Sequence, residues 1–313
     1  MVLLVILSMM LGFVLLMCGA RILCDSVIRL AYRFNVSSVA AGVLLVSIGT
    51  AAPDLTSVVT ATLKGYSDFS VGNILGSNFS NLTLGFGIAA LVSPFRCAKR
   101  ILSVDLPLLF VITVFFVICC IDGNLTRVDG ILFLSIFACY SFFSLRKTKP
   151  RFAIGRVEFG ENVANCAAWK NCMAFVAATI LLACGSHLVV MSCVGIADNF
   201  GLSQTFVGFS LSSLGTSAPE IFVVATAAKR RYHTICSGNV FGSNLINLMF
   251  VAGLCATIHP ICFHENDFYQ EACALILVTA ASWYIFWTRK VFSRALGAAL
   301  VATYLAVIFL VKN

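Results

Sequence analysis

Ser-Ile-Gly-Thr-Ala-Ala-Pro-Asp at residues 47–54 returns as Ser-Leu-Gly-Thr-Ser-Ala-Pro-Glu at residues 213–220, a shift of 166 positions. The same shift relates Gly-Asn-Ile-Leu-Gly-Ser-Asn at 72–78 to Gly-Asn-Val-Phe-Gly-Ser-Asn at 238–244. The repeated residues are polar, although the sequence around them is apolar, and an ionisable group in such surroundings is costly to keep. The chain has therefore duplicated a buried carboxylate together with its setting.

The composition indicates that this chain is surrounded by lipid and not by water. It is 60% hydrophobic and 11% charged, with a mean hydropathy of +0.99, whereas roughly a quarter of the residues of a soluble domain are charged. Apolar stretches of about 20 residues are long enough to cross a bilayer. We predict an all-α membrane protein of ten transmembrane helices near 2–21, 36–62, 70–93, 101–121, 128–145, 171–192, 203–228, 236–258, 271–288 and 295–311.

The duplication divides the chain into two halves of five helices each. Between residues 42–90 and 208–256, 20 of 49 aligned positions are identical without a gap. We predict a first half at 1–145 with its repeat at 36–90, a charged cytoplasmic linker at 146–170, and a second half at 171–313 with its repeat at 202–256.

The basic residues predict the orientation. Eighteen of the 21 Lys and Arg residues follow odd-numbered spans, and only Lys64, Arg127 and Lys312 lie on the other side. Cytoplasmic loops retain basic residues, so we place both termini outside the cell, and five spans per half invert the second repeat. We expect the cytoplasmic (plasma) membrane, with an organellar membrane as the alternative. The net charge of +8 then serves anionic lipid and requires no nucleic acid.

Proline opens the helix at the centre of each repeat. A proline deletes the hydrogen bond to the carbonyl four residues earlier, so Pro53 frees the carbonyl of Gly49 and Pro219 frees that of Gly215. Freed backbone is tolerated at membrane depth only where it faces protein or a water-filled cavity. We expect these carbonyls, with those of Thr50 and Thr216, to be available to a cation.

Oxygen-bearing side chains share one helical face with each opened turn. Their spacing is i, i+3, i+7 in the broken helix and i, i+4 in the helix that follows. The candidate ligands are Ser47, Thr50, Asp54, Ser77 and Asn81 in the first half and Ser213, Thr216, Glu220, Ser243 and Asn247 in the second. Such hard oxygen ligands suit calcium, sodium or magnesium. Two facing carboxylates are neutralised by one divalent ion, two monovalent ions or two protons, so exchange between them follows from charge balance.

The doubled motif resembles the alpha repeats of the sodium/calcium exchangers, within the calcium/cation antiporter superfamily. The family signature is Gly-Thr/Asn-Ser/Gly-x-Pro-Glu/Asp followed by Gly-Asn-x-x-Gly-Ser-Asn. The resemblance implies a secondary transporter, not an enzyme, that exchanges calcium for sodium by alternating access and carries no cofactor. It implies that Asp54 and Glu220 bind calcium with the carbonyls of Thr50 and Thr216. It further implies that the flanking sodium sites are completed by Ser47, Ser77, Ser213, Ser243 and Asn81.

Two positions depart from that pattern. Asp54 stands where many prokaryotic relatives have Glu, and Asn247 stands where the second repeat often has Asp. The site then offers two negative charges instead of three, which leaves ion choice and stoichiometry open. Asp105, in the fourth predicted span, has no acidic counterpart in the other half, and we expect it at the membrane interface.

Other classes fit the residues less well. An intramembrane aspartyl protease needs Gly-x-Gly-Asp and two Asp, whereas both acids here follow Ala-Pro. A channel of this kind is an oligomer around an axis, whereas an inverted repeat within one chain predicts alternating access. A calcium/proton antiporter stays open as the alternative. Protons and potassium are accordingly further candidate counter-ions, although Ser77 and Ser243 favour sodium, because a proton needs no oxygen cage.

The predicted orientation is tested by thiol labelling. A cysteine placed in the 146–170 linker is expected to resist an impermeant thiol reagent in intact cells, and one at the C-terminus is expected to react. Both are compared with the unmodified protein, which has 14 cysteines. The reverse pattern would overturn the orientation.

Overall fold

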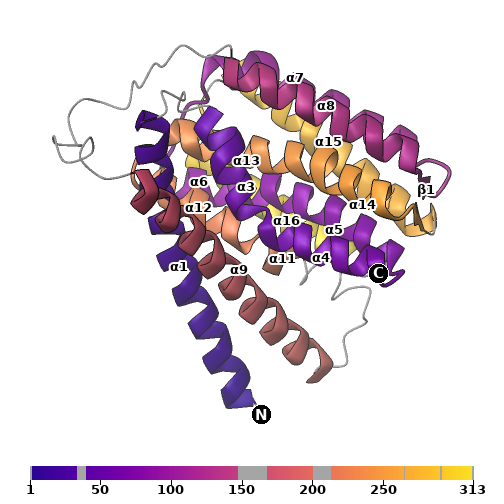
Figure 1. Ribbon diagram of the computed structural model, residues 1–313, viewed down its shortest axis with the longest axis horizontal. Helices are drawn as coiled ribbons and strands as arrows, with labels where there is room; N and C mark the ends of the chain where they lie inside the picture. The colour runs from indigo at the N-terminus through magenta and orange to yellow at the C-terminus, as the bar shows by residue number, and fades with distance from the viewer. Residues whose placement is uncertain are drawn as a thin grey trace.

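The computed structural model describes residues 2–33, 40–146, 168–199, 213–263, 265–289 and 291–311, and these are almost wholly helical (Figure 1). In the first half the elements are α1 (Val2–Arg33), η1 (Ala41–Val46), α3 (Ser47–Thr50), α4 (Ala52–Leu63), α5 (Ser67–Ser80), η2 (Asn81–Gly85), α6 (Phe86–Val92), η3 (Ile101–Asp105), α7 (Leu106–Cys119), β1 (Asn124–Leu125) and α8 (Arg127–Arg146). In the second half they are α9 (Ala168–Asn199), α11 (Ser213–Thr216), α12 (Ala218–Lys229), α13 (His233–Leu245), η6 (Ile246–Val251), α14 (Ala252–Ile258), β2 (Ile261–Cys262), α15 (Glu265–Arg289) and α16 (Arg294–Val311). The elements labelled η are π-helical turns.

Both repeats break where the sequence predicts it. Ala51 separates α3 from α4, and Ser217 separates α11 from α12, with a proline in the first turn of each later helix. The segments Ala41–Thr50 and Ala52–Leu63 meet at a bend of 51°. A second irregularity was not predicted: π-helical turns follow α5 and α13 at equivalent positions, beginning at Asn81 and Ile246. Such turns are rare and are frequent at functional sites.

Not all of the ten predicted spans are matched. Within the described ranges, seven helices are long and apolar enough to cross a bilayer, or eight if the bent pair counts as one span. The apolar helix at Arg294–Leu310 is shorter, and the predicted span near 203–228 lies partly outside the described residues, as does most of the linker at 146–170. The structure is a multi-helix membrane bundle, while the count of ten stays a prediction.

Contacts between loops show which ends of the helices lie together. β1 pairs with β2, which joins the loops after the fourth and eighth predicted spans. Phe95 forms a backbone bridge with Phe292, which joins the loops after the third and ninth spans. Asp25, near the end of the first span, forms an ion pair with Arg230 at the end of the seventh. Loops that follow even-numbered spans thus contact each other, and so do loops that follow odd-numbered spans. This is expected when successive helices cross the membrane in alternating directions.

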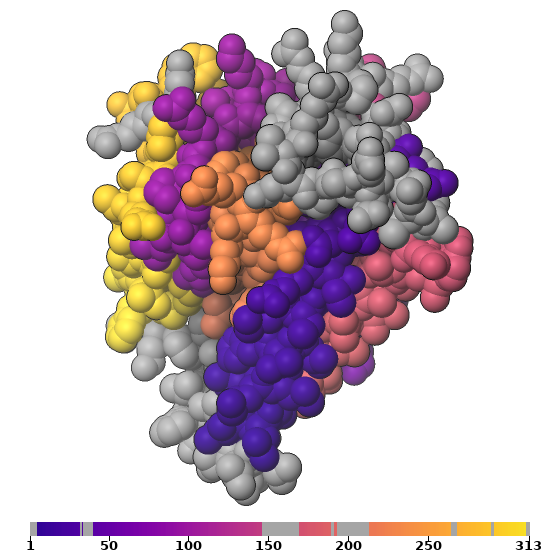
Figure 2. Space-filling model, turned by 90° about the vertical axis from the view of Figure 1, so that its left-hand side faces the viewer, coloured from indigo at the N-terminus to yellow at the C-terminus, as the bar shows by residue number. Residues whose placement is uncertain are grey.

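The long helices α1 and α9 pack on each other along one side of the bundle (Figures 1 and 2). Two close approaches between them are related by the 166-residue shift: a Cβ on Gly19 would lie 2.9 Å from Leu182, and one on Gly185 would lie 3.0 Å from Leu16. Glycine is required at these crossing points because any side chain would separate the helices. The two helices therefore contact each other through equivalent residues of the two halves.

A further buried acid, Asp105, lies away from the repeats. Its side chain is fully buried in η3 and accepts a hydrogen bond of 2.8 Å from the Tyr140 hydroxyl, while its position at the membrane interface stays a prediction. Arg100, one turn earlier, donates to Ser144 on the same helix as Tyr140. The tyrosine, which the sequence pattern did not single out, makes burial of the carboxyl group tolerable.

Candidate functional site

The ten predicted ligand residues lie in the interior of the bundle. The broken helices α3–α4 and α11–α12 contact α5 and α13 there, with the π-helical turns at the edge. Exposed fractions are 4% for Thr216 and at most 1% for the other nine, which are Ser47, Thr50, Asp54, Ser77, Asn81, Ser213, Glu220, Ser243 and Asn247. Polar groups this deep require partners or a ligand.

Asp54 is held by both halves of the chain. One carboxylate oxygen accepts a hydrogen bond of 2.9 Å from the Ser77 hydroxyl, and the other accepts one of 2.9 Å from the Asn247 side-chain amide. Ser77 belongs to the first repeat and Asn247 to the second. The two halves therefore meet at this carboxylate.

Glu220 has no equivalent partners, although it occupies the matching position. Within the described part of the chain, both of its carboxylate oxygens and both polar atoms of the Asn81 side chain lack a hydrogen-bond partner, as does the side-chain oxygen of Asn247. The electrostatic neighbours of Glu220 include Asp54, Thr50 and Ser243. Buried carboxylate and amide oxygens without a hydrogen-bond partner are suited to ligate a cation.

Two hydroxyl pairs link the halves across the centre. The Ser77 hydroxyl lies 3.4 Å from that of Thr216, and the Thr50 hydroxyl lies 3.5 Å from that of Ser243. The 166-residue shift converts one pair into the other, so the site has pseudo-twofold symmetry. Six of the ten predicted residues thus contact one another in two groups: Thr50 with Ser243, and Thr216, Ser77, Asp54 and Asn247 in a chain.

Asn239 is a site residue that our candidate set omitted. Its side-chain oxygen accepts hydrogen bonds of 3.3 Å from both Ser47 and Thr50, and its backbone carbonyl accepts one of 3.0 Å from Ser47. The signal was present in the duplicated Gly-Asn that opens the second motif. The Ser47 hydroxyl is thus engaged with Asn239 and not with a carboxylate.

One of the two carbonyls freed by proline has a partner. The Ser186 hydroxyl of α9 donates a hydrogen bond of 2.5 Å to the carbonyl of Gly215. The matching residue of α1 is Ala20, which has no hydroxyl. The two opened turns are therefore chemically different despite their common sequence.

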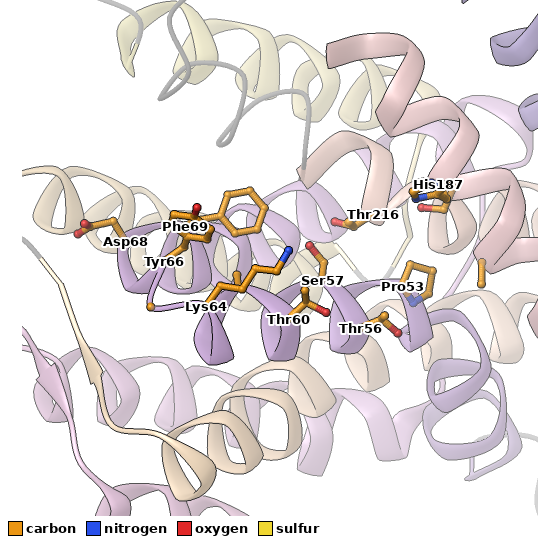
Figure 3. A pocket seen from close by; sticks show the side chains of 14 residues that line it. Pro53, Thr56, Ser57, Thr60, Lys64, Tyr66, Asp68, Phe69, His187 and Thr216 are labelled. Carbon is orange, nitrogen blue, oxygen red and sulfur yellow. The ribbon is translucent and has the colours of Figure 1, made fainter. Parts of the chain in front are cut away.

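A cavity of about 810 Å³ connects the site with one end of the bundle (Figure 3). It reaches from the turn between α4 and α5 to Pro53 and Thr216, and α9 contributes the opposite wall. Its polar and charged lining comprises Thr56, Ser57, Thr60, Lys64, Tyr66, Asp68, Ser186, His187 and Thr216. No group of three or more His, Cys, Asp or Glu residues is close enough to hold a metal within the described ranges. The acids of the site are two, with hydroxyls and amides around them.

Comparison with known proteins agrees with this architecture. The model of the sodium/calcium exchanger protein family matches residues 4–146 and again 170–312. The chain belongs to this family. Sodium/calcium exchangers are secondary transporters of the membrane and not enzymes, and the two matches coincide with the two halves of the chain.

Relatives of this sodium/calcium exchanger family member can be aligned with most of its length. The putative antiporter CaxA of Alkalimonas amylolytica is 30% identical over 80% of this chain and 79% of its own. The sodium/calcium exchanger MaX1 of Methanosarcina acetivorans is 26% identical over 96% of each chain. The solved structure of the sodium-calcium exchanger NCX_Mj superposes with a TM-score of 0.82 at 24% identity and covers 99% of both chains, which shows a common fold.

The contact of α13 with the broken helix generates a stability prediction. A Cβ on Gly242 would lie 2.2 Å from the Val43 carbonyl oxygen and 2.3 Å from the Ser47 hydroxyl, whereas one on Gly72 would meet only Glu271 at 3.7 Å. We expect Gly242→Ala to destabilise by about 1–3 kcal/mol, the usual cost of overpacking, and Gly72→Ala to be tolerated. Thermal unfolding of the purified variants in detergent measures both, and equal midpoints would contradict the close contact.

Proposed function

We propose that the chain is a secondary active antiporter that exchanges calcium for sodium by alternating access at the duplicated carboxylate site. The observation that carries the proposal is the pair Asp54 and Glu220, which are buried at matching positions; within the described ranges the Glu220 carboxylate oxygens have no hydrogen-bond partner. A divalent ion between two carboxylates cancels both charges at once, which suits a site of low dielectric. Calcium also favours six to eight oxygen ligands, and this interior is unusually rich in them.

The roles that we propose for the site residues are those that the family resemblance implies. We assign calcium to Asp54 and Glu220 with the carbonyls of Thr50 and Thr216. We assign the flanking sodium ions to the oxygens on either side, from Ser47, Ser77, Asn81, Ser213, Ser243 and Asn247. Asn81 supports the assignment best, because its amide is buried and has no hydrogen-bond partner in the described part of the chain. Sodium has to displace the Asn239 contacts before it reaches Ser47.

Alternating access is supported by the two inverted halves and by the cavity, which reaches the site from one end of the bundle. On our predicted orientation that end is extracellular. The relatives named sodium/calcium exchanger support calcium and sodium as the transported ions. Proton coupling is the second candidate, because two adjacent buried carboxylates are able to take up protons in place of sodium.

The counter-ion dependence of calcium flux tests this function. In reconstituted vesicles we expect calcium uptake to require an outward sodium gradient and to be insensitive to a proton gradient of equal size. Asp54→Asn and Glu220→Gln are each expected to abolish uptake, because a divalent ion left with one carboxylate retains an uncompensated charge in a low-dielectric site. Uptake driven by protons alone would favour the alternative, and near-normal flux in both folded variants would reject the site.

The neutral amide at position 247 predicts the stoichiometry. With only two acids, one calcium or two sodium ions neutralise the site, and a third sodium would leave a positive charge inside the membrane. We therefore expect two-for-one, electroneutral exchange. The measurement is sodium-driven calcium flux at membrane potentials set with potassium and valinomycin. A flux that accelerates at one sign of potential and slows at the other would show a third sodium ion.

A further inference from the structure

Lys64 is a basic residue in the wall of the cavity that leads to the cation site. It is the C-cap residue of α4, its side chain is exposed, and it lines the same cavity as Thr216. In Figure 3 its ammonium group points along the cavity toward the end where Thr216 lies. A positive charge is an unexpected lining for a route that cations use, since it repels them.

The other charges of the cavity do not neutralise Lys64. Asp68 and His187 also line the cavity, and in Figure 3 the Asp68 carboxylate points away from the Thr216 end. Within the described ranges Lys64 forms no ion pair, and the single ion pair found there joins Arg230 to Asp25. Among the described residues, no ion-paired carboxylate therefore neutralises the charge that the ammonium group presents to ions in the cavity.

The duplication supplies the contrast. Arg230 is the C-cap residue of α12, 166 residues after Lys64 at the C-cap of α4, so it is the equivalent basic residue of the second half. Arg230 is paired with Asp25 of α1, whereas the residue of α9 that matches Asp25 is Met191. The same basic position is thus neutralised at one end of the bundle and left charged at the other.

We propose that Lys64 is a charge filter that lowers the affinity for divalent cations at the cavity face only. In an inverted-repeat transporter, the route from the opposite face passes the equivalent position, where the Arg230 charge is cancelled by Asp25. Calcium then meets a repulsive charge from one side of the membrane and none from the other. Because calcium has to be transported for this to be measured, the inference rests on the proposed function.

Coulomb's law sets the size of the effect. A unit charge held about 7 Å away in water-like surroundings lowers the local concentration of a monovalent cation about threefold. The interaction energy doubles for a divalent ion, so the factor is squared to about ninefold. Salt screens the effect, since the Debye length falls from about 30 Å at 0.01 M to about 8 Å at 0.15 M.

The test compares the two faces of the membrane. The half-saturating calcium and sodium concentrations for exchange are measured in right-side-out and everted vesicles from the same cells at low ionic strength. We expect Lys64→Gln to lower the value about ninefold for calcium and about threefold for sodium on the cavity face, with neither value changed on the opposite face. On the cavity face, the half-saturating calcium concentration of the unmodified protein is expected to be lower at 0.15 M salt than at low ionic strength. This comparison needs no variant.

Two matched controls isolate the charge in the cavity. Lys64→Arg keeps the charge and is expected to behave like the unmodified protein. Arg127→Gln removes an exposed basic residue predicted on the same side but outside the cavity, and it is expected to have no effect. An equal change on both faces, an equal change in Lys64→Arg, or no change in Lys64→Gln would each overturn the filter. If the unmodified protein exchanges calcium for sodium but Lys64→Gln leaves the half-saturating concentrations unchanged, only the charge filter is rejected. If the unmodified protein shows no calcium flux, the proposed function is rejected together with the filter.

Discussion

The free-energy cost of burying two carboxylates in one protein interior determines how the surrounding elements are arranged. Even after relaxation, an ion removed from water loses several kcal/mol of hydration free energy, and two neighbouring negative charges add their mutual repulsion. The fold provides the Asp54 carboxylate with a hydroxyl from one half and an amide from the other, whereas both carboxylate oxygens of Glu220 lack a hydrogen-bond partner among the described residues. The helix breaks at Ala51 and Ser217 lie three residues before these two acids, at matching positions of the two halves.

The sequence revealed this site because a buried acid and its neighbours occur twice at one constant spacing, and such a repeat does not arise by chance. The breaks before Pro53 and Pro219 and the burial of all ten predicted residues follow from local rules: proline removes a hydrogen bond, and hydroxyls spaced at i, i+3 and i+7 share a face. The family match agrees with the two halves. These parts depend on short stretches of chain, which is why they were predictable.

What the sequence did not reveal depends on contacts between distant segments. The π-helical turns at Asn81 and Ile246 shift side chains by a fraction of a turn, and no local pattern marks them. The bonds from Ser186 to Gly215 and from Tyr140 to Asp105 join residues that are separate in sequence and chemically ordinary in isolation. The short helix α16 and the partly described span near 203–228 leave the number of crossings at a prediction, since length and hydropathy alone do not decide it.

The bond from Ser186 to the Gly215 carbonyl shows how far the halves have diverged. A chain assembled from two copies of the first half would place alanine where Ser186 stands, aspartate at position 220 and lysine at position 230. Its two opened turns would be alike, and its two faces would present the same charge to an approaching ion. Such a symmetrised protein would lose any built-in difference between loading from one side and loading from the other. Divergence after duplication, in this view, is what gives an otherwise reversible machine a preferred direction of loading.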